Sequence, residues 1–330
     1  MKDNLLEVTD LYISFNKKGR TINAVDGISF SIKRGEILGI AGESGCGKTL
    51  TALSITGLLP QKAKITGGEI KYKDLYLTSV KNKSINEKEF NKVRGREISI
   101  IFQEYRQSLN PLIRVGKQIT ETLKLFGINK EEYKKRAEEI LYRLGFNEPE
   151  NICNLYPHQL SGGMCQRIMT AIALISRPGL LIADEPSTAL DSQSQDCMFS
   201  LFNEINRDYG TSILIISHDL SVIKKLCSRY SIMYCGKILE EGPSHTLFSP
   251  VHPYTKALAG AIPNGSKKGK DLLTIPPSNH YAEDNLKGCP FAPRCIKAQM
   301  KCFEIFPSAN YGIKDRVFHC YFPEQGDADG

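Results

Sequence analysis

The stretch Gly42-Glu-Ser-Gly-Cys-Gly-Lys-Thr49 decides how this chain folds. It has the spacing G-x4-G-K-S/T of a phosphate-binding loop. The apolar run Glu36–Ala41, which reads as a strand, precedes it, and a helical pattern runs from Thr49 to Leu59. The backbone N–H groups of such a loop can surround an anion, and the helix N-terminus adds its positive dipole. The sequence therefore predicts a nucleotide phosphate site between a strand and a helix.

Within this loop, Lys48 is expected to meet the β and γ phosphates and Thr49 to offer its hydroxyl to Mg²⁺. Cys46 is interpreted as an incidental small residue whose backbone shares the loop. The remaining candidate nucleotide contacts of this segment are Gly42, Ser44, Gly45, Gly47 and Leu50.

A second motif, Leu180-Leu-Ile-Ala-Asp-Glu185, is an apolar strand that ends in two carboxylates. Ligands of open α/β folds bind at the carboxyl ends of the strands. We therefore expect Asp184 to join the Mg²⁺ shell and Glu185 to polarise an attacking water.

A third motif, Leu160-Ser-Gly-Gly-Met164, precedes a predicted helix at about 162–176. Ser161, Gly162 and Gly163 at a helix N-terminus can form a second phosphate-binding surface. On its own the same pattern also fits a simple capped turn. Its position between the other two motifs favours the phosphate-binding interpretation.

Composition supports an ordinary globular protein of the α/β class. The 330 residues, with 41% apolar and 24% charged residues, suffice for about two domains. Short apolar strands at 98–102, 180–183 and 212–216 alternate with helical patterns, which predicts a parallel sheet. The segment 115–145 carries helical spacing and predicts a helical insertion.

The longest apolar stretch, Ile168–Ile175, is too short to span a bilayer, and Met1–Glu7 lacks the pattern of a signal peptide. We therefore expect a cytoplasmic location. The net charge of +7 (43 basic minus 36 acidic residues) does not by itself identify a partner. Its basic runs at Lys81–Arg96 and Lys267–Lys270 are interpreted as solvated loops.

Taken in order, these motifs resemble the nucleotide-binding subunit of an ATP-binding cassette (ABC) transporter over nearly the whole chain. The matching segments are 42–49, Gln103, 160–164, 180–185, 187–191 and His218. The resemblance implies a RecA-like P-loop NTPase core with an antiparallel β subdomain and a helical subdomain at about 105–165. It also implies a division into a nucleotide-binding domain, 1–242, and a small Cys-rich C-terminal extension, 243–330.

The resemblance also implies roles for single residues. Gln103 is similar to the residue that contacts Mg²⁺ and the attacking water, His218 to the one that contacts the γ phosphate, and Asp191 to the loop that couples two sites. Phe15 resembles the aromatic residue that stacks on adenine, with a core role as the alternative reading and Tyr12 as its competitor.

Family members pair head to tail around two ATP molecules, so Ser161, Gly162 and Gly163 are implied to serve the nucleotide of a second ABC ATPase subunit, identical or paralogous. Met164 departs from the family pattern, which has Gln there. We expect nucleotide binding to survive this change, with the loss of one polar contact across the dimer.

Four of the ten cysteines cluster near the end of the chain, at Cys289, Cys295, Cys302 and Cys320. Four thiolates can enclose an iron-sulfur cluster or a zinc ion, and free thiols are the third possibility. The segment His252–Leu258 and this tail resemble the extension of dipeptide, oligopeptide and nickel importer ATPases. That resemblance implies a 4Fe-4S cluster. Because the tail has too few large aliphatic residues to fold well unaided, a structural role is expected, with redox sensing as the alternative. His319, beside Cys320, is interpreted as a bystander.

The resemblance therefore implies an ATPase that powers import of dipeptides or oligopeptides from the cytoplasmic face of the membrane. The implied partners are two transmembrane permease subunits and an extracytoplasmic substrate-binding protein, without nucleic acid. The alternatives are nickel or another small solute as cargo, a soluble ABC ATPase that acts on nucleic acid, and a tail that serves as a nucleic-acid-binding finger.

Overall fold

The structure of the chain is a computed structural model that describes residues 4–17, 20–79, 84–85, 87–103, 108–188, 190–261, 287–313 and 315–324. The basic run Lys267–Lys270, part of Lys81–Arg96 and one residue of the segment 187–191 lie outside the described residues. No described helix combines the length and the apolar character that a bilayer crossing requires.

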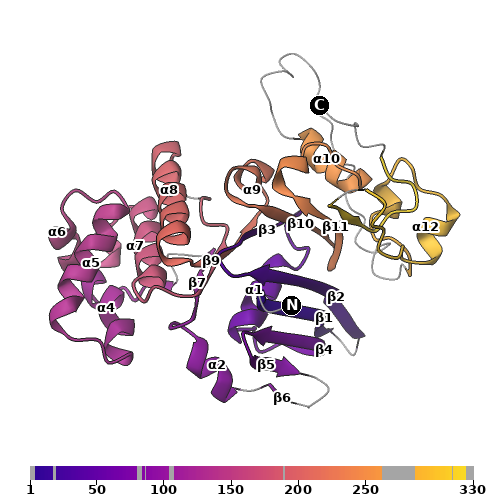
Figure 1. Cartoon of the computed structure of the whole chain (residues 1–330). Coiled ribbons are helices and arrows are strands. Elements are labelled where there is room, and N and C mark those ends of the chain that lie inside the picture. The colour runs from indigo at the N-terminus through magenta and orange to yellow at the C-terminus, as the bar shows by residue number, and fades with distance from the viewer. Residues whose placement is uncertain are drawn as a thin grey trace.

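The centre of the fold is a seven-stranded sheet with the order β12-β11-β10-β3-β9-β8-β7 (Figure 1). The strands from β10 to β7 are parallel, and β11 and β12 are antiparallel. Every residue of β3, β8 and β9 is buried, as expected for parallel strands that are covered on both faces. The bounds are β3 Ile37–Ala41, β7 Ile98–Ile101, β8 Leu180–Asp184, β9 Ser212–Ser217, β10 Arg229–Tyr234, β11 Lys237–Pro243 and β12 Val317–Phe318.

A second, antiparallel sheet has the order β2-β1-β4-β5-β6. Its strands are β1 Asn4–Lys17, β2 Arg20–Lys33, β4 Ala63–Tyr72, β5 Leu75–Ser79 and β6 Ser84–Ile85. It shares one hydrophobic core with helix α1, Lys48–Thr56, and with one face of the central sheet, to which Leu180 and Ile182 contribute.

The alternate residues Leu181 and Ala183 belong to the other core, which contains the helices. Figure 1 shows α4 to α8 gathered on one side of the molecule, away from the antiparallel sheet. The bounds of the helices before the extension are α2 Glu87–Val93, α4 Val115–Leu125, α5 Glu131–Arg143, α6 Pro149–Asn154, α7 Gly162–Leu174, α8 Ser192–Tyr209 and α9 Leu220–Leu226.

The C-terminal extension packs on the far edge of the central sheet, beside β11 (Figure 1). It contains α10 Pro253–Ala261, a 3₁₀ turn at Ala292–Arg294, α12 Met300–Glu304 and β12. The fully buried carboxylate of Glu240 in β11 accepts hydrogen bonds from the Tyr230 hydroxyl at 2.7 Å and from the backbone N–H of His252 at 2.8 Å. Because the charge of a buried carboxylate needs such donors, these bonds fix the chain where it enters α10.

The observed elements follow the expected α/β pattern. The predicted strands at 98–102, 180–183 and 212–216 correspond to β7, β8 and β9, and the helical segment 115–145 contains α4 and α5. This segment is interrupted at Gly127, whose φ of 68° is the left-handed conformation that ends helices.

Candidate functional site

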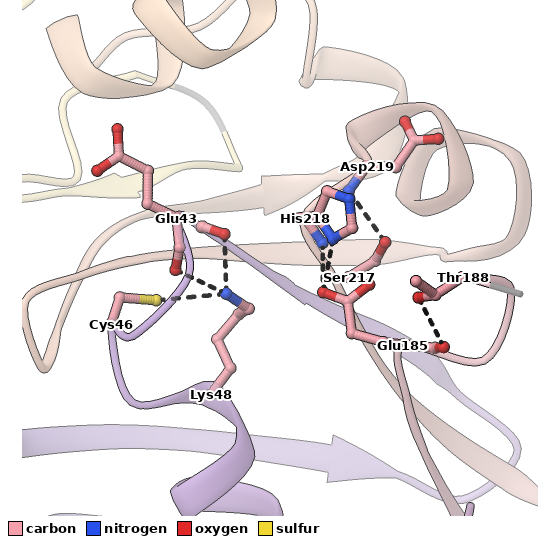
Figure 2. A network of polar contacts seen from close by, with 9 residues as sticks. Glu43, Cys46, Lys48, Glu185, Thr188, Ser217, His218 and Asp219 are labelled. Atoms are coloured by element: carbon pink, nitrogen blue, oxygen red, sulfur yellow. Dashed lines mark hydrogen bonds and ion pairs between the residues drawn. The ribbon is translucent and has the colours of Figure 1, made fainter. Parts of the chain in front are cut away.

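The candidate site lies where four neighbouring parallel strands end. The phosphate loop follows β3, Gln103 follows β7, Glu185 follows β8 and His218 follows β9. Because β3, β9, β8 and β7 are adjacent and parallel, these segments emerge at one edge of the sheet. Figure 2 shows Lys48 on one side of this region and the pair Glu185–His218 on the other.

Two glycines allow the phosphate loop to pack tightly against the sheet. A Cβ atom on Gly42 would lie 2.0 Å from the carbonyl oxygen of Met233, and one on Gly47 would lie 2.5 Å from that of Ala24. Gly47 also has a φ of 107° and is the N-cap of α1, where it supplies no side-chain cap. The first N–H groups of α1 therefore remain suitable for binding a phosphate.

Lys48 is folded back onto the loop. Its Nζ donates hydrogen bonds to the carbonyl oxygens of Gly42 at 2.8 Å and Glu43 at 2.9 Å, and lies 3.6 Å from the Cys46 sulfur. Burial raises the pKa of the Cys46 thiol, so this sulfur stays protonated. A phosphate that entered the loop would offer the ammonium group a stronger acceptor than two neutral carbonyls.

Asp184 is the best candidate for a magnesium ligand. Its side chain is buried, and its Oδ1 atom has no hydrogen-bond partner among the described residues. Burial and the charge of Glu185 raise its pKa to about 6, although the Thr49 hydroxyl and Lys48 oppose this shift. A buried carboxylate oxygen without a donor, beside a threonine hydroxyl, fits a divalent cation that takes oxygen ligands.

Glu185 and His218 form a hydrogen-bonded pair. Glu185 Oε1 lies 2.8 Å from His218 Nδ1 and accepts the His218 backbone N–H at 3.1 Å. Glu185 has a φ of 51°, which is unfavourable for a residue with a side chain and is found mainly at functional sites. The Glu185 side chain is 10% exposed and that of His218 is 59% exposed. The carboxylate is thus held in one orientation next to Asp184, while the imidazole remains open to solvent.

The remaining candidates lie on other elements. Phe15 is half-buried in β1 against the core, and Tyr12, on the same strand, packs against Gly27 and Gly67. Gln103 is exposed after β7. Within the phosphate loop itself, Ser44, Gly45 and Thr49 are exposed and Leu50 is half-buried.

The third motif begins α7. Ser161 is exposed and caps this helix, because its hydroxyl accepts the backbone N–H of Met164 at 3.3 Å. Gly162 and Gly163 form the first turn and are half-buried. Asp191 caps α8 in the same manner, because its carboxylate accepts the Ser194 N–H at 2.9 Å. This hydrogen bond lowers the pKa of the Asp191 carboxyl.

The four clustered cysteines come together in space. Cys289, Cys295, Cys302 and Cys320 line one pocket of about 310 Å³, a volume that includes its open mouth. Burial raises the pKa of Cys289 to about 12 and that of Cys320 to about 11, so a bound cation is needed to hold them as thiolates. In the described residues, no three His, Cys, Asp or Glu side chains are arranged to hold a metal ion.

His252 lies in the wall of this cysteine pocket. Burial lowers its pKa to about 3, so the ring is neutral. Its Nδ1 accepts the backbone N–H of Tyr254 at 3.0 Å, which places the ring proton on Nε2. The His319 backbone opposes this shift of the His252 pKa, but Nε2 is buried and makes no hydrogen bond of good geometry with the described residues, so it offers a donor. His319 differs, because its Nδ1 lies 2.9 Å from the carbonyl oxygen of Pro307.

Sequence reasoning missed two groups of residues near these sites. In the loop pattern Glu43 occupies a position open to any residue, and its partner Arg294, like Tyr234, belongs to no motif. Tyr254 lies within the segment His252–Leu258, but nothing in that segment pairs it with the loop. The segment His252–Leu258 resembles a family feature, but its sequence does not show the environment of the His252 Nε2 atom, which is defined only in the folded pocket.

Comparisons with known proteins agree with this geometry. Residues 25–188 match the ABC transporter family, and residues 239–302 match the oligopeptide/dipeptide transporter C-terminal region. The chain is 43% identical to the oligopeptide transport ATP-binding protein AppD of Bacillus subtilis, over 98% of both chains. It is 41% identical to the oligopeptide transport ATP-binding protein OppD of Salmonella typhimurium, over 97% of this chain and 94% of that one.

Solved structures show the same fold. The ATP-binding cassette MJ0796, in a dimeric post-hydrolysis state bound to ADP and Pi, is similar with a TM-score of 0.64 and 28% identity, over 72% of this chain and 98% of that one. The protein cbiO1 of Clostridium perfringens, part of an ABC transporter complex, has a TM-score of 0.62 and 27% identity, over 75% of this chain and 91% of that one. The expected RecA-like core is therefore confirmed.

The raised pKa of Asp184 predicts a pH-dependent need for magnesium. A metal ligand must lose its proton, so the Mg²⁺ concentration needed for half-maximal ATP binding should rise below pH 6, by up to about tenfold per pH unit. Fluorescent-nucleotide binding at pH 5–8 measures this concentration.

The variant Glu185→Gln serves as the control, because it removes a charge that raises the Asp184 pKa and leaves the titration of ATP itself unchanged. In Glu185→Gln the Mg²⁺ concentration needed for half-maximal ATP binding should begin to rise at a lower pH than in the parent. Identical pH profiles for the two proteins would contradict this interpretation of Asp184.

Proposed function

The chain belongs to the family of ATP-binding subunits of oligopeptide and dipeptide ABC transporters, and from this membership we propose that it powers the import of short peptides. It is an ATPase coupled to transport. One observation supports this function at the level of residues: side chains suited to ATP hydrolysis lie together at one edge of the sheet. They are Lys48, Asp184, Glu185 and His218.

The described contacts support a division of labour in hydrolysis. Lys48 would leave its two carbonyl acceptors for the β and γ phosphates, and the first turn of α1 would receive the phosphate oxygens. Thr49 and Asp184 would hold Mg²⁺, with Gln103 as a further ligand; the ion neutralises charge on the phosphates when it is bound. Glu185 would orient the attacking water as general base, and His218 would contact the γ phosphate while holding Glu185 in place.

We further propose that two cassettes close around the nucleotide. The exposed Ser161 and the following glycines at the start of α7 would contact the nucleotide held by a second subunit. The similar cassette MJ0796 forms a dimer with bound ADP and Pi, which supports this arrangement. Asp191 would couple the two sites, and Phe15 would stack on adenine. Since Met164 meets Ser161 through its backbone N–H, the departure from Gln leaves this cap intact.

The proposed assembly places the chain on the cytoplasmic face of the membrane. Its partners would be two permease subunits, an extracytoplasmic substrate-binding protein and a second ATPase subunit. The relatives named for oligopeptide and dipeptide transport favour peptides over nickel as cargo. The same similarity extends over 98% of the chain, the cysteine-rich tail included, and so disfavours a nucleic-acid enzyme or finger.

We propose that the cysteine pocket of the extension holds a 4Fe-4S cluster. Four cysteines line the pocket, and the unused Nε2–H of His252 offers a hydrogen bond to sulfur acceptors. A single zinc ion requires four ligands that converge on one point at about 2.3 Å. A four-iron cluster is wider and needs no such convergence, which favours it over zinc. The cluster would supply cross-links that a short segment with a small core lacks.

The variant Glu185→Gln tests the catalytic assignment. Loss of the general base should lower the ATPase rate by about 10²–10⁴-fold, while MgATP binding persists and a closed dimer accumulates. Steady-state hydrolysis and size-exclusion chromatography with MgATP measure both effects. The exposed Glu121→Gln is the matched control and should behave as the parent does. Rapid hydrolysis by Glu185→Gln would show that another group is the base.

Anaerobic purification tests the cluster. The protein should be brown and contain about four irons per chain, as Cys₄ ligation of a four-iron cluster implies. Cys295→Ser should lose the colour and the iron, whereas Cys153→Ser, on α6, should keep both. A colourless protein with one zinc per chain would show that the pocket holds zinc and that the cluster proposal is wrong.

Isolation of the native complex tests the partners. Affinity purification of the chain from its own membranes should bring down permease subunits in detergent and no nuclease-sensitive nucleic acid. Stoichiometric RNA or DNA without permease subunits would instead support the nucleic-acid alternative.

A further inference from the structure

We propose that the C-terminal extension positions the phosphate loop for nucleotide, with Arg294 and Tyr254 as the positioning residues and Glu43 as the loop residue that they hold. The inference goes beyond a structural or metal-binding role for the extension, and it rests on the proposed nucleotide site. It makes residues more than two hundred positions downstream a part of that site.

The first contact is a two-point ion pair. Arg294 Nη1 and Nη2 donate to the two carboxylate oxygens of Glu43 at 2.8 and 3.0 Å. The Arg294 side chain is 6% exposed and that of Glu43 is 32% exposed, so the pair is largely shielded from water. A planar guanidinium bound at both oxygens fixes the orientation of a carboxylate as well as its position.

The second contact reaches the backbone of the same loop residue. The Glu43 N–H donates to the Tyr254 hydroxyl at 2.9 Å. Tyr254 belongs to an aromatic group with Tyr234 and Phe291, whose ring centroids lie 4.6 and 5.2 Å from its own. Arg294 Nη1 also donates to the Tyr234 hydroxyl at 2.9 Å. Both contacts to Glu43 therefore arise from one packed unit.

Glu43 is also the residue on which Lys48 rests. Its carbonyl oxygen accepts Lys48 Nζ, while its carboxylate points the other way, as Figure 2 shows. When Lys48 turns to a phosphate, the loop loses the two carbonyl contacts that help to hold it. Arg294 and Tyr254 do not depend on Lys48, so they keep the loop in shape during this exchange. A loop that is ordered before binding loses less entropy when nucleotide arrives.

Arg294 lies within the cysteine-rich segment. The 3₁₀ turn Ala292–Arg294 is bounded by Cys289 and Cys295, and the Ala292 N–H donates to the Cys289 carbonyl at 2.9 Å. The position of the guanidinium is thus set by the fold of the thiol pocket. This places the cysteine-rich segment, through the Arg294 side chain, in contact with the phosphate loop.

Steady-state kinetics of the full-length chain test the proposal. In Arg294→Ala the KM for ATP should rise about tenfold while kcat stays within about twofold, because the pair shapes binding and not the chemical step. Arg294→Lys keeps the charge without the two-point contact and should raise KM about threefold. Tyr254→Phe, which removes only the hydroxyl, should also raise KM about threefold. Lys256→Ala is the matched control, because Lys256 pairs with Glu324 in the same extension. The KM of this variant for ATP should equal that of the parent.

Glu43→Gln weakens the same contact from the side of the loop. It allows nucleotide binding to be measured even if Arg294→Ala does not fold. It should weaken binding of fluorescent ADP about as much as Arg294→Ala does, and adding Arg294→Ala should cause little further loss, because both changes break one contact. A merely structural role would lower the active fraction, and thus the apparent kcat, with KM unchanged. That result, or a KM for Arg294→Ala within twofold of the parent, overturns the proposal. A parent chain that binds no nucleotide would refute the proposed site itself.

Discussion

Parallel pairing of β3, β9 and β8 is the constraint on which the nucleotide site depends. Each strand is buried on both faces, so its central residues are apolar, and the polar chemistry is carried by the strand ends and by the segments that follow. Since the strands run the same way, the phosphate loop, Asp184–Glu185 and His218 meet at one edge. A single antiparallel strand in this place would send one of these groups to the opposite end of the sheet.

The phosphate loop is supported from two directions. On one side Gly42 and Gly47 lie against the backbones of β10 and β2, at distances that no side chain would allow. On the other side Glu43 is held by residues of the C-terminal extension. The rigid frame leaves Lys48 as the group that can move, because its present acceptors are neutral carbonyls.

Much of this arrangement could be predicted from the sequence, because it is local. Three motifs are each defined by a short residue spacing that requires one backbone geometry. They are the loop at 42–49, the acidic end of β8 and the start of α7. The partners of Glu43 could not be predicted, since Arg294 lies 251 residues away and an isolated arginine has no spacing to interpret. His252 has the same difficulty: its unused nitrogen is defined by the absence of a partner, which only a folded pocket can show.

The two-residue strand β12 has a consequence for the solubility of the chain. β12 pairs its two residues with Glu240 and Glu241 of β11, and the next N–H, that of His319, donates to Leu239 at 2.9 Å. These few bonds cover the outer rim of the large sheet. A chain cut short before Val317 would present bare β11 backbone to its neighbours, and such a rim recruits strands from other molecules. The C-terminal tail thus protects the sheet edge from aggregation, in addition to carrying the clustered cysteines.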